Sequence, residues 1–176
     1  MPECPSNEHI AGLFALITAV LIFVLQFLSE YFRRKEDRRQ QDILDRMNCY
    51  DQISSLIARR IYRTRRIPYA AQPSNTVTME TAQSDYKDIV FEWNDSITPL
   101  LAKIEIFFGP GLRQKLESNV IPRVIAVGSH AQKFIRGAAS SEDIKALQSE
   151  IDSVNAETYE FDKSLCKLVL APKFKR

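Results

Sequence analysis

The chain has 176 residues, of which 45% are hydrophobic and 26% charged, and this is sufficient for one compact domain with a real core. Its 24 Lys and Arg against 22 Asp and Glu give a net charge of +2, which excludes a global electrostatic case for binding nucleic acid or adhering to membranes. The isolated cysteines (Cys4, Cys49 and Cys166) and the distant His9 and His130 predict free thiols, no metal centre and no cofactor.

The first predicted element is a membrane-spanning helix at residues 10–29, which follows a tail of residues 1–9. From Ile10 to Leu28 the sequence carries no charge, and at about 1.5 Å per residue this length approximately spans a hydrocarbon core of about 30 Å. A buried core helix is the alternative, but such helices are seldom apolar on every side over this length. We therefore expect one pass through a membrane.

A basic neck at residues 30–42 follows the span and sets its predicted orientation. Glu3 and Glu8 precede the apolar run, whereas a signal peptide would carry positive charge there. The positive-inside rule predicts that the N-terminus lies outside and the C-terminal domain in the cytoplasm. The basic residues of the neck are Arg33, Arg34, Lys35, Arg38 and Arg39.

Small and polar residues mark one face of the span at spacings of three and four. Such a stripe suits close helix contact or a lumen, so we expect a homo-oligomer among membrane lipids. An amide in hydrocarbon lacks water, so Gln26 gains by facing another subunit or a hydrated pore; alternatively it reaches the inner interface. The stripe consists of Ala11, Ala15, Thr18, Ala19, Ile22, Gln26 and Ser29.

Residues 43–176 are predicted to form an up-and-down helical bundle, so the fold class is all-α. The helix of the span continues into the bundle, because apolar residues recur at helical spacing with no Gly or Pro before Pro68. Residues 67–83 are predicted to be a loop. The predicted inward positions of this first helix are Ile43, Met47, Tyr50, Ile53, Ile57 and Ile61.

Two further helices are expected after the loop. The second begins near Ser84 and is kinked or restarted at Pro99. The third covers residues 112–135, is kinked at Pro122 and is capped by Gly137. Their predicted inward positions are Tyr86, Ile89, Val90, Trp93, Ile97, Leu100, Ile104 and Phe107 in the second helix, and Leu116, Val120, Val124, Val127, Ala131 and Phe134 in the third.

The last predicted helix begins at a capping-box-like pair, Ser140 and Asp143. Thr158 interrupts its apolar heptad. The short links between the last three helices favour antiparallel neighbours, with the lower part of the first helix completing the bundle. The apolar positions of the last helix are Ile144, Leu147, Ile151, Val154, Phe161, Leu165 and Leu168.

One pair of residues could carry chemistry, Arg123 and His130 in the string RVIAVGSH. Seven residues of helix make almost two turns, so both side chains lie on one face, at the edge of the apolar stripe. Arg supplies a permanent cation for a phosphate, and His can exchange a proton near neutral pH. This is the minimal equipment for metal-independent RNA cleavage, although the same pair can serve as a structural polar rim.

An Arg and a His in this arrangement, on one helix of a small helical bundle, resemble the RxxxxH-type motif of the HEPN superfamily, to which many prokaryotic defence ribonucleases belong. A single transmembrane helix before a HEPN-like bundle resembles the membrane accessory proteins of type VI-B CRISPR loci. Members of that family are taken to form ring-like oligomers around a membrane pore. The resemblance implies a functional partnership with the RNA-guided RNase of such loci, in antiviral defence.

Three functions follow as expectations. The first is a non-enzymatic pore that permeabilises or depolarises the inner membrane; the second is a membrane-tethered HEPN ribonuclease that acts on RNA; the third is a passive membrane scaffold. Val124 follows the motif Arg, where active HEPN ribonucleases usually carry a polar residue. We therefore expect no general RNase activity and favour the pore.

Overall fold

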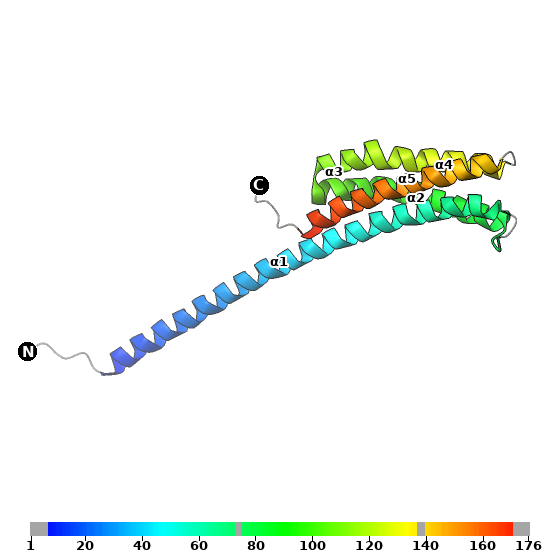
Figure 1. Ribbon diagram of the computed structural model, residues 1–176. Helices are drawn as coiled ribbons and strands as arrows, with labels where there is room; N and C mark the ends of the chain where they lie inside the picture. The colour runs from blue at the N-terminus through cyan, green and yellow to red at the C-terminus, as the bar shows by residue number, and fades with distance from the viewer. Residues whose placement is uncertain (1–6, 73–74, 137–139, 171–176) are drawn as a thin grey trace, which may run out of the picture. The chain divides into compact units, whose positions relative to one another are not determined.

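The computed structural model describes residues 7–72, 75–136 and 140–170, and over these ranges it is helical with short connections, which confirms the predicted all-α class (Figure 1). The chain divides into two compact units, Met1–Leu44 and Asp45–Arg176. Its elements are α1 (Asn7–Ala70), α2 (Met79–Phe108), α3 (Pro110–Lys115), the π-helical turn η1 (Leu116–Val120), α4 (Ile121–Ile135) and α5 (Ser141–Leu170).

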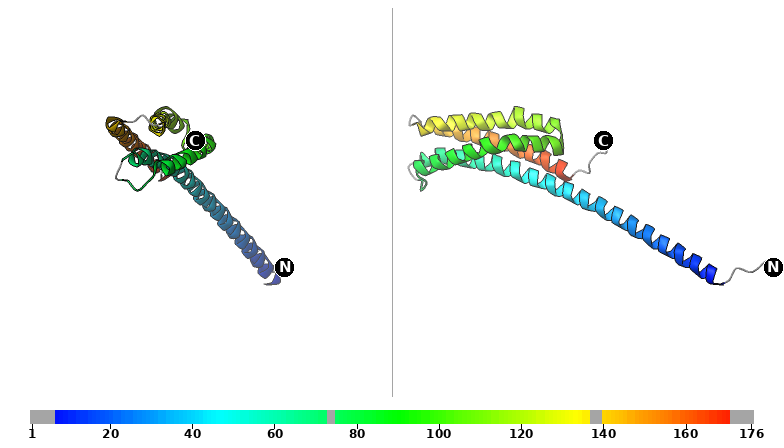
Figure 2. Two further views of the ribbon diagram at one scale, coloured as in Figure 1. Left: turned by 90° about the vertical axis from the view of Figure 1, so that its right-hand side faces the viewer. Right: turned by 180° about the vertical axis from the view of Figure 1, so that it is seen from behind.

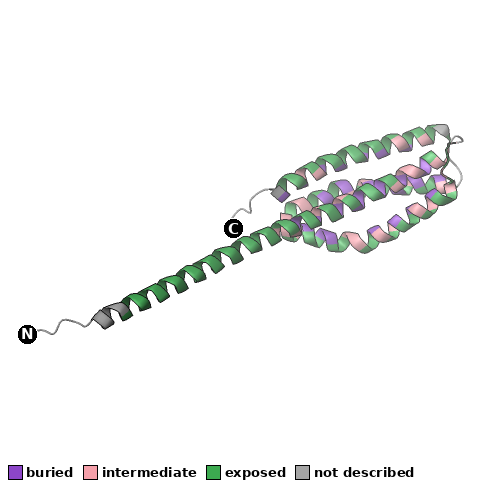
Figure 3. Ribbon diagram, turned by 90° about the horizontal axis from the view of Figure 1, so that it is seen from below, coloured by how far each residue is buried: buried purple, intermediate pink, exposed green. Residues whose placement is uncertain are grey.

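The first unit contains the N-terminal part of α1. Its apolar stretch is long and hydrophobic enough to cross a membrane, and none of its most apolar window is buried by the rest of the chain. Residues 12–41 are all exposed, including large side chains such as Phe14, Phe23 and Phe27 (Figure 3). The protein therefore has a long apolar helical surface that it does not cover with its own side chains.

The second unit is an antiparallel four-helix bundle. Its first helix is the C-terminal part of α1 from Asp45, and α2, the α3–η1–α4 segment and α5 follow in alternating directions (Figures 1 and 2). Polar contacts tie neighbouring helices together, as between Arg59 of α1 and Glu92 of α2 at 2.6 Å, and between Ser54 of α1 and Asp162 of α5 at 2.6 Å. These contacts frame a common core.

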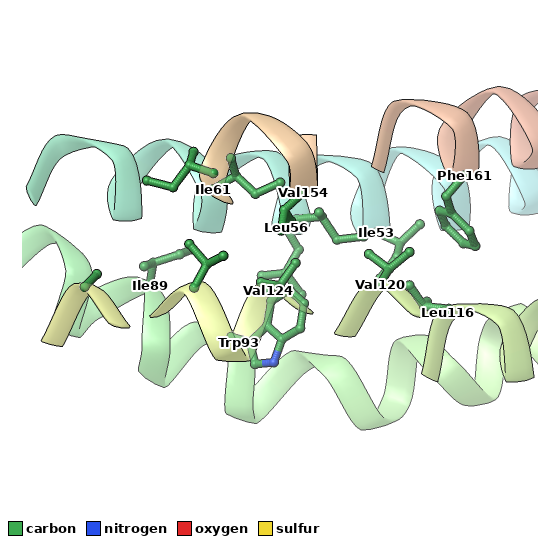
Figure 4. Close-up of a cluster of buried hydrophobic side chains, with 14 of the residues drawn as sticks. Ile53, Leu56, Ile61, Ile89, Trp93, Leu116, Val120, Val124, Val154 and Phe161 are labelled. Carbon is green, nitrogen blue, oxygen red and sulfur yellow. The ribbon is translucent and has the colours of Figure 1, made fainter. Parts of the chain in front are cut away.

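The core of the bundle draws on every long helix. Figure 4 shows Leu56 of α1, Trp93 of α2, Val124 of α4 and Val154 of α5 close together, whereas Phe161 of α5 lies further along the same core. The inward positions predicted for the second and third helices are buried or half-buried, as helical spacing requires. The positions buried in the N-terminal parts of the bundle helices include Cys49, Ile53, Ile57, Ile61, Ala82, Tyr86 and Ile89.

The loop after α1 is shorter than the sequence suggests. α1 continues through Pro68, whose ring is fully buried, because a proline in the last turn sacrifices just one backbone hydrogen bond there. α2 begins directly after Thr78, whose hydroxyl accepts a hydrogen bond from the N–H of Thr81 at 3.2 Å. The bounds predicted for the loop, residues 67–83, are therefore wrong at both ends, since residues 71–78 connect the helices.

The ends of the predicted stripes also shift. Ile43 and Met47, predicted to point inward, are exposed by 39% and 44%. The last inward position of α5 is Val169, because Leu168 is exposed; the other predicted positions of this helix are buried or half-buried. Thr158 does not interrupt the apolar face: it is buried, and its hydroxyl donates to the Val154 carbonyl at 2.8 Å.

The predicted helix signals have mixed outcomes. Pro99 lies within a single continuous α2, so the helix does not restart there. Ser140 and Asp143 form the predicted reciprocal box: the Ser140 N–H donates to the Asp143 carboxylate at 2.8 Å, and the Asp143 N–H donates to the Ser140 hydroxyl at 3.2 Å. The Ser140 hydroxyl also donates to this carboxylate, at 2.7 Å, and together with the Ser140 N–H it holds the pKa of Asp143 below its usual range. The predicted cap Gly137 lies outside the described residues.

Candidate functional site

The pair Arg123 and His130 lies on α4 and faces α5. Arg123 forms an ion pair with Glu157, and its Nη2 donates to Ser153 Oγ at 3.0 Å. The Nδ1 atom of His130 lies 2.9 Å from the Glu150 carboxylate. On both helices the paired residues are seven positions apart, in opposite directions, so two similar ties join the antiparallel helices.

These ties decide what the pair can do chemically. A phosphate approaching Arg123 would have to displace Glu157 and would be repelled by it. The imidazole of His130 is held between Glu150 and the ring of Phe134, whose centroid lies 5.7 Å away. The arrangement suits a polar tie between α4 and α5 better than it suits RNA cleavage, which needs a cation available to phosphate.

A π-helical turn, η1, precedes this pair, where the sequence predicts a kink at Pro122. Pro122 has no N–H to donate to the carbonyl four residues earlier. Just before it the helix widens, and the Ile121 N–H bonds to the Leu116 carbonyl, five residues earlier. A groove of about 640 Å³ opens between η1 and α5. Its walls carry two cations and two carboxylates, so it has no net charge: Lys115, Arg123, Glu157 and Glu160.

A second constellation, which the sequence analysis missed, is centred on Arg60 in the middle of the bundle. The Arg60 side chain is 5% exposed, and its guanidinium lies over the rings of Trp93 and Tyr86, at 5.2 and 5.7 Å from their centroids. Its Nε and Nη1 atoms have no hydrogen-bond partner among the described residues. Burial lowers the pKa of Arg60 and raises that of Tyr86, because both charged forms lose water.

Gly128 of α4 provides the space that this constellation needs. A Cβ atom at Gly128 would lie 2.6 Å from the Tyr86 hydroxyl and 3.4 Å from Nη2 of Arg60. Gly128 therefore does not break α4, which continues through it; it lets the phenol pack against the helix backbone. In the sequence, Arg60 lies between the apolar positions Ile57 and Ile61, and this was the available signal for the cluster. The signal was missed because a charged residue is normally assigned to the surface.

The stripe predicted on the span lies on exposed helix. Ala15, Ala19 and Ile22 have no contact that buries them, and Gln26 makes no hydrogen bond to a described residue. The Thr18 hydroxyl donates to the Phe14 carbonyl at 2.8 Å, so it is satisfied within its own helix. Ser29 is exposed as well, whereas the side chain of Ala11 lies outside the description.

The basic neck is helical and exposed. Arg34 pairs with Glu30, one turn earlier, at 3.4 Å. Such exposed pairs contribute little stability, about 0.3–0.5 kcal/mol at helical spacing, so the cations of the neck stay accessible to an anionic surface. The other cations of this segment are Arg33, Lys35, Arg38 and Arg39.

Cys49 is a free, buried thiol and Cys166 a free, exposed one, as predicted, while Cys4 lies outside the described residues. Burial raises the pKa of Cys49, so its thiol stays protonated. Within the described ranges, no group of three or more His, Cys, Asp or Glu side chains could hold a metal ion.

No family model, curated protein or solved structure matches the chain. The HEPN likeness therefore remains a prediction, based on Arg123, His130 and the single apolar helix before a bundle. Function has to be argued from the geometry of the chain itself.

Proposed function

We propose that this chain is a membrane-anchored, oligomeric pore-forming accessory of antiviral CRISPR defence. In this proposal residues 10–29 span the bacterial inner membrane, with the N-terminus outside and the bundle in the cytoplasm. The assembled span permeabilises or depolarises the membrane when the RNA-guided RNase of the same locus is active. The bundle is HEPN-like in architecture and acts without cleaving RNA.

The observation that carries the proposal is the uncovered apolar helix at residues 12–29. None of its most apolar window is buried by the chain, although buried apolar surface stabilises a protein by about 25 cal/mol per Å². Exposed apolar patches beyond a few hundred Å² mark membrane or protein contacts. Lipid and other copies of the same helix are the coverings that suit an apolar segment of this length.

Assembly is supported by the small side chains on one face of the helix. Ala15 and Ala19 lie one turn apart and allow close approach of backbones, which is what holds helices together in lipid. Gln26 follows on the same face and has no hydrogen-bond partner among the described residues. In hydrocarbon its amide would be satisfied by another subunit or by water in a lumen.

The contacts of Arg123 and His130 with carboxylates of α5 favour the pore over the ribonuclease. Each faces a carboxylate of α5, so this surface offers RNA no net positive charge. The tie also gives both residues a structural function. Replacing either should weaken the packing of α4 on α5 rather than abolish a reaction.

The proposal is tested by following membrane potential in cells that express the protein with an activated RNA-guided RNase. A voltage-sensitive dye should report depolarisation with the full chain, and phage protection should rise in the same cells. A truncation that begins near Arg33 removes the span and should lose both effects at matched protein levels. Equal protection by this truncation, without depolarisation, would refute the pore.

Matched substitutions distinguish an effect of the small-residue stripe on assembly from an effect on membrane insertion. Ala15→Leu with Ala19→Leu adds bulk to the small face, whereas Val20→Leu with Val24→Leu adds bulk elsewhere on the same helix. The first pair should abolish depolarisation and the second should preserve it. If depolarisation persists in both, and if purified protein cleaves RNA in a manner that requires His130, the ribonuclease is the better interpretation.

A further inference from the structure

Two arginines of the bundle share an aromatic neighbour. Arg60 and Arg136 form no ion pair with a described residue, and both lie near Tyr86: Arg60 is stacked over its ring, and Arg136 lines the same groove as Tyr86. The arginines that do form ion pairs are Arg59, Arg63, Arg65, Arg66, Arg113 and Arg123.

The groove that Tyr86 and Arg136 line has a volume of about 360 Å³ and lies between α2 and α4. This is within the range of small-molecule sites. Lys87 and Arg136 contribute cations, and no carboxylate lines the groove. The α2–α4 groove therefore differs from the groove between η1 and α5, which has no net charge because its two cations are balanced by two carboxylates. The remaining lining residues are Gln83, Val90, Phe91, Gln132 and Ile135.

One aromatic side chain that lines this groove, Phe91, is largely exposed. Phe91 is 58% exposed, although it is a large apolar residue, and the Lys87 ammonium lies 5.9 Å from its ring centroid. A ring held at the surface beside cations offers a face on which a planar ligand can stack. The apolar side chains of Val90 and Ile135 add to the same lining.

Behind the lining, the buried guanidinium of Arg60 adds positive potential. Its charge lies over the Tyr86 ring in a low-dielectric interior, and none of the carboxylates in the described ion pairs contacts it. Charge in such surroundings is screened less than at the surface. Three cations thus bias this side of α2 and α4 towards an anion.

From these observations we infer that the α2–α4 groove binds a nucleoside monophosphate or a closely similar heteroaromatic phosphate. The phosphate is held by Arg136 and Lys87, since Arg matches phosphate oxygens with paired N–H donors and Lys binds them as a point charge. The base stacks on Phe91. The amides of Gln83 and Gln132 supply hydrogen bonds to its polar edge.

The polar groups in the lining favour a nucleotide over a lipid. An acyl chain would leave the amide of Gln83 without a partner at a contact that excludes water. A base offers donors and acceptors to this amide, and to whichever groups of the Gln132 amide its hydrogen bond with Tyr86 leaves available. A lipid phosphate is therefore the contrary outcome of the test, and the inference stands or falls independently of pore formation.

Calorimetric titration of the full chain in a non-ionic detergent tests the inference. The probes are the four ribonucleoside 5′-monophosphates, adenosine, inorganic phosphate and the soluble lipid dihexanoyl phosphatidate. At least one nucleotide should bind saturably, and adenosine and inorganic phosphate should each bind at least about tenfold more weakly than it does, because each lacks half of the contacts. Saturable binding of the lipid alone, or of no probe, would overturn it.

Variants localise the binding to the groove. Lys87→Gln with Arg136→Gln should weaken nucleotide binding by about tenfold or more, and Phe91→Ala should weaken it several-fold. Because these three side chains are exposed, the bundle should keep its helical content and unfolding midpoint. Lys133→Gln with Lys145→Gln removes two exposed cations outside the groove and should leave the affinity unchanged. Equal affinity in both double variants would refute the site.

Discussion

The two parts of α1 differ in what covers their apolar side chains. Residues 12–41 expose every side chain, large apolar ones included, whereas residues 49–68 place an apolar stripe in a closed core. The first part has no covering of its own, and the second is covered by α2, α4 and α5. The hydrophobicity of a helix therefore does not by itself determine whether the helix is buried in a core. That depends on which other elements cover its apolar face.

The largest expected difference between the two parts of α1 is in bundle stability after a carboxylate is introduced into each part. Ile57→Asp places a carboxylate at a fully buried position, so we expect the bundle to lose about 5 kcal/mol or more and to unfold. Leu21→Asp, in the exposed part, should leave bundle stability unchanged and oppose membrane insertion, by about 2.5–3.5 kcal/mol at mid-membrane. Circular dichroism and membrane fractionation measure the two effects; similar unfolding by both would remove the distinction.

Replacing a glycine in each part of the chain compares the packed core with the exposed helix through the addition of a single methyl group. Gly128→Ala puts a methyl group 2.6 Å from the Tyr86 hydroxyl in the core, and its cost should exceed the gain in helix propensity, for a net loss of about 1–2 kcal/mol. Gly12→Ala meets nothing within 4 Å and should leave bundle stability unchanged.

The clash itself is checked with a second substitution. Tyr86→Phe removes the hydroxyl, so it should restore most of the stability in the Gly128→Ala background. Chemical denaturation of the four proteins of this cycle gives the coupling energy. Strict additivity of the two substitutions would show that the contact is not the cause.

A polar residue in each part allows a further comparison. Arg60→Met exchanges a buried cation with two unpartnered N–H groups for an apolar chain of similar length, so we expect a gain of about 1 kcal/mol despite the lost aromatic contacts. Gln26→Leu should not change bundle stability, and its effect should appear in assembly. Denaturation midpoints measured by circular dichroism decide; a large loss in Arg60→Met would mean that its aromatic contacts dominate.

The smallest expected effect depends on pH and involves the contact of α1 with α5. Burial raises the pKa of Asp162, and the hydrogen bond from Ser54 opposes this only in part. The folded protein therefore binds this proton more tightly than the unfolded chain does. The contribution of Asp162 to stability should rise as pH falls through its folded-state pKa and be lost as pH rises through it.

Asp162→Asn tests this contribution. The variant should be more stable than the wild type at neutral pH and should lose that advantage in mildly acidic solution, as measured by denaturation across that pH range. A constant difference between the two proteins would assign the effect to packing.

Much of the fold could be predicted because helical periodicity is a local signal. The apolar spacing around Trp93 and Val124 identified core faces, and the Ser140–Asp143 pair marked a helix start. Helix ends were less predictable: buried Pro68 shows that tertiary packing can extend a helix past a residue that normally ends it.

The site was harder to predict, since it depends on neighbours that are distant in sequence. Helical spacing placed Arg123 and His130 on one face of α4, and both contact α5, but only Arg123 lines the groove beside η1. The acids that meet them belong to α5, and their register is set by the packed bundle. Arg60 was missed for the opposite reason: a charged residue is assigned to the surface unless aromatic partners such as Trp93 are known.

The central claim is that the exposed part of α1 is covered by other copies in a membrane. Its most direct test is the mass of the full chain extracted in mild non-ionic detergent, measured by native mass spectrometry or light scattering. We predict a discrete homo-oligomer that Ala15→Leu with Ala19→Leu breaks down and Val20→Leu with Val24→Leu leaves intact. A monodisperse monomer, or equal breakdown by both pairs of substitutions, would contradict the account.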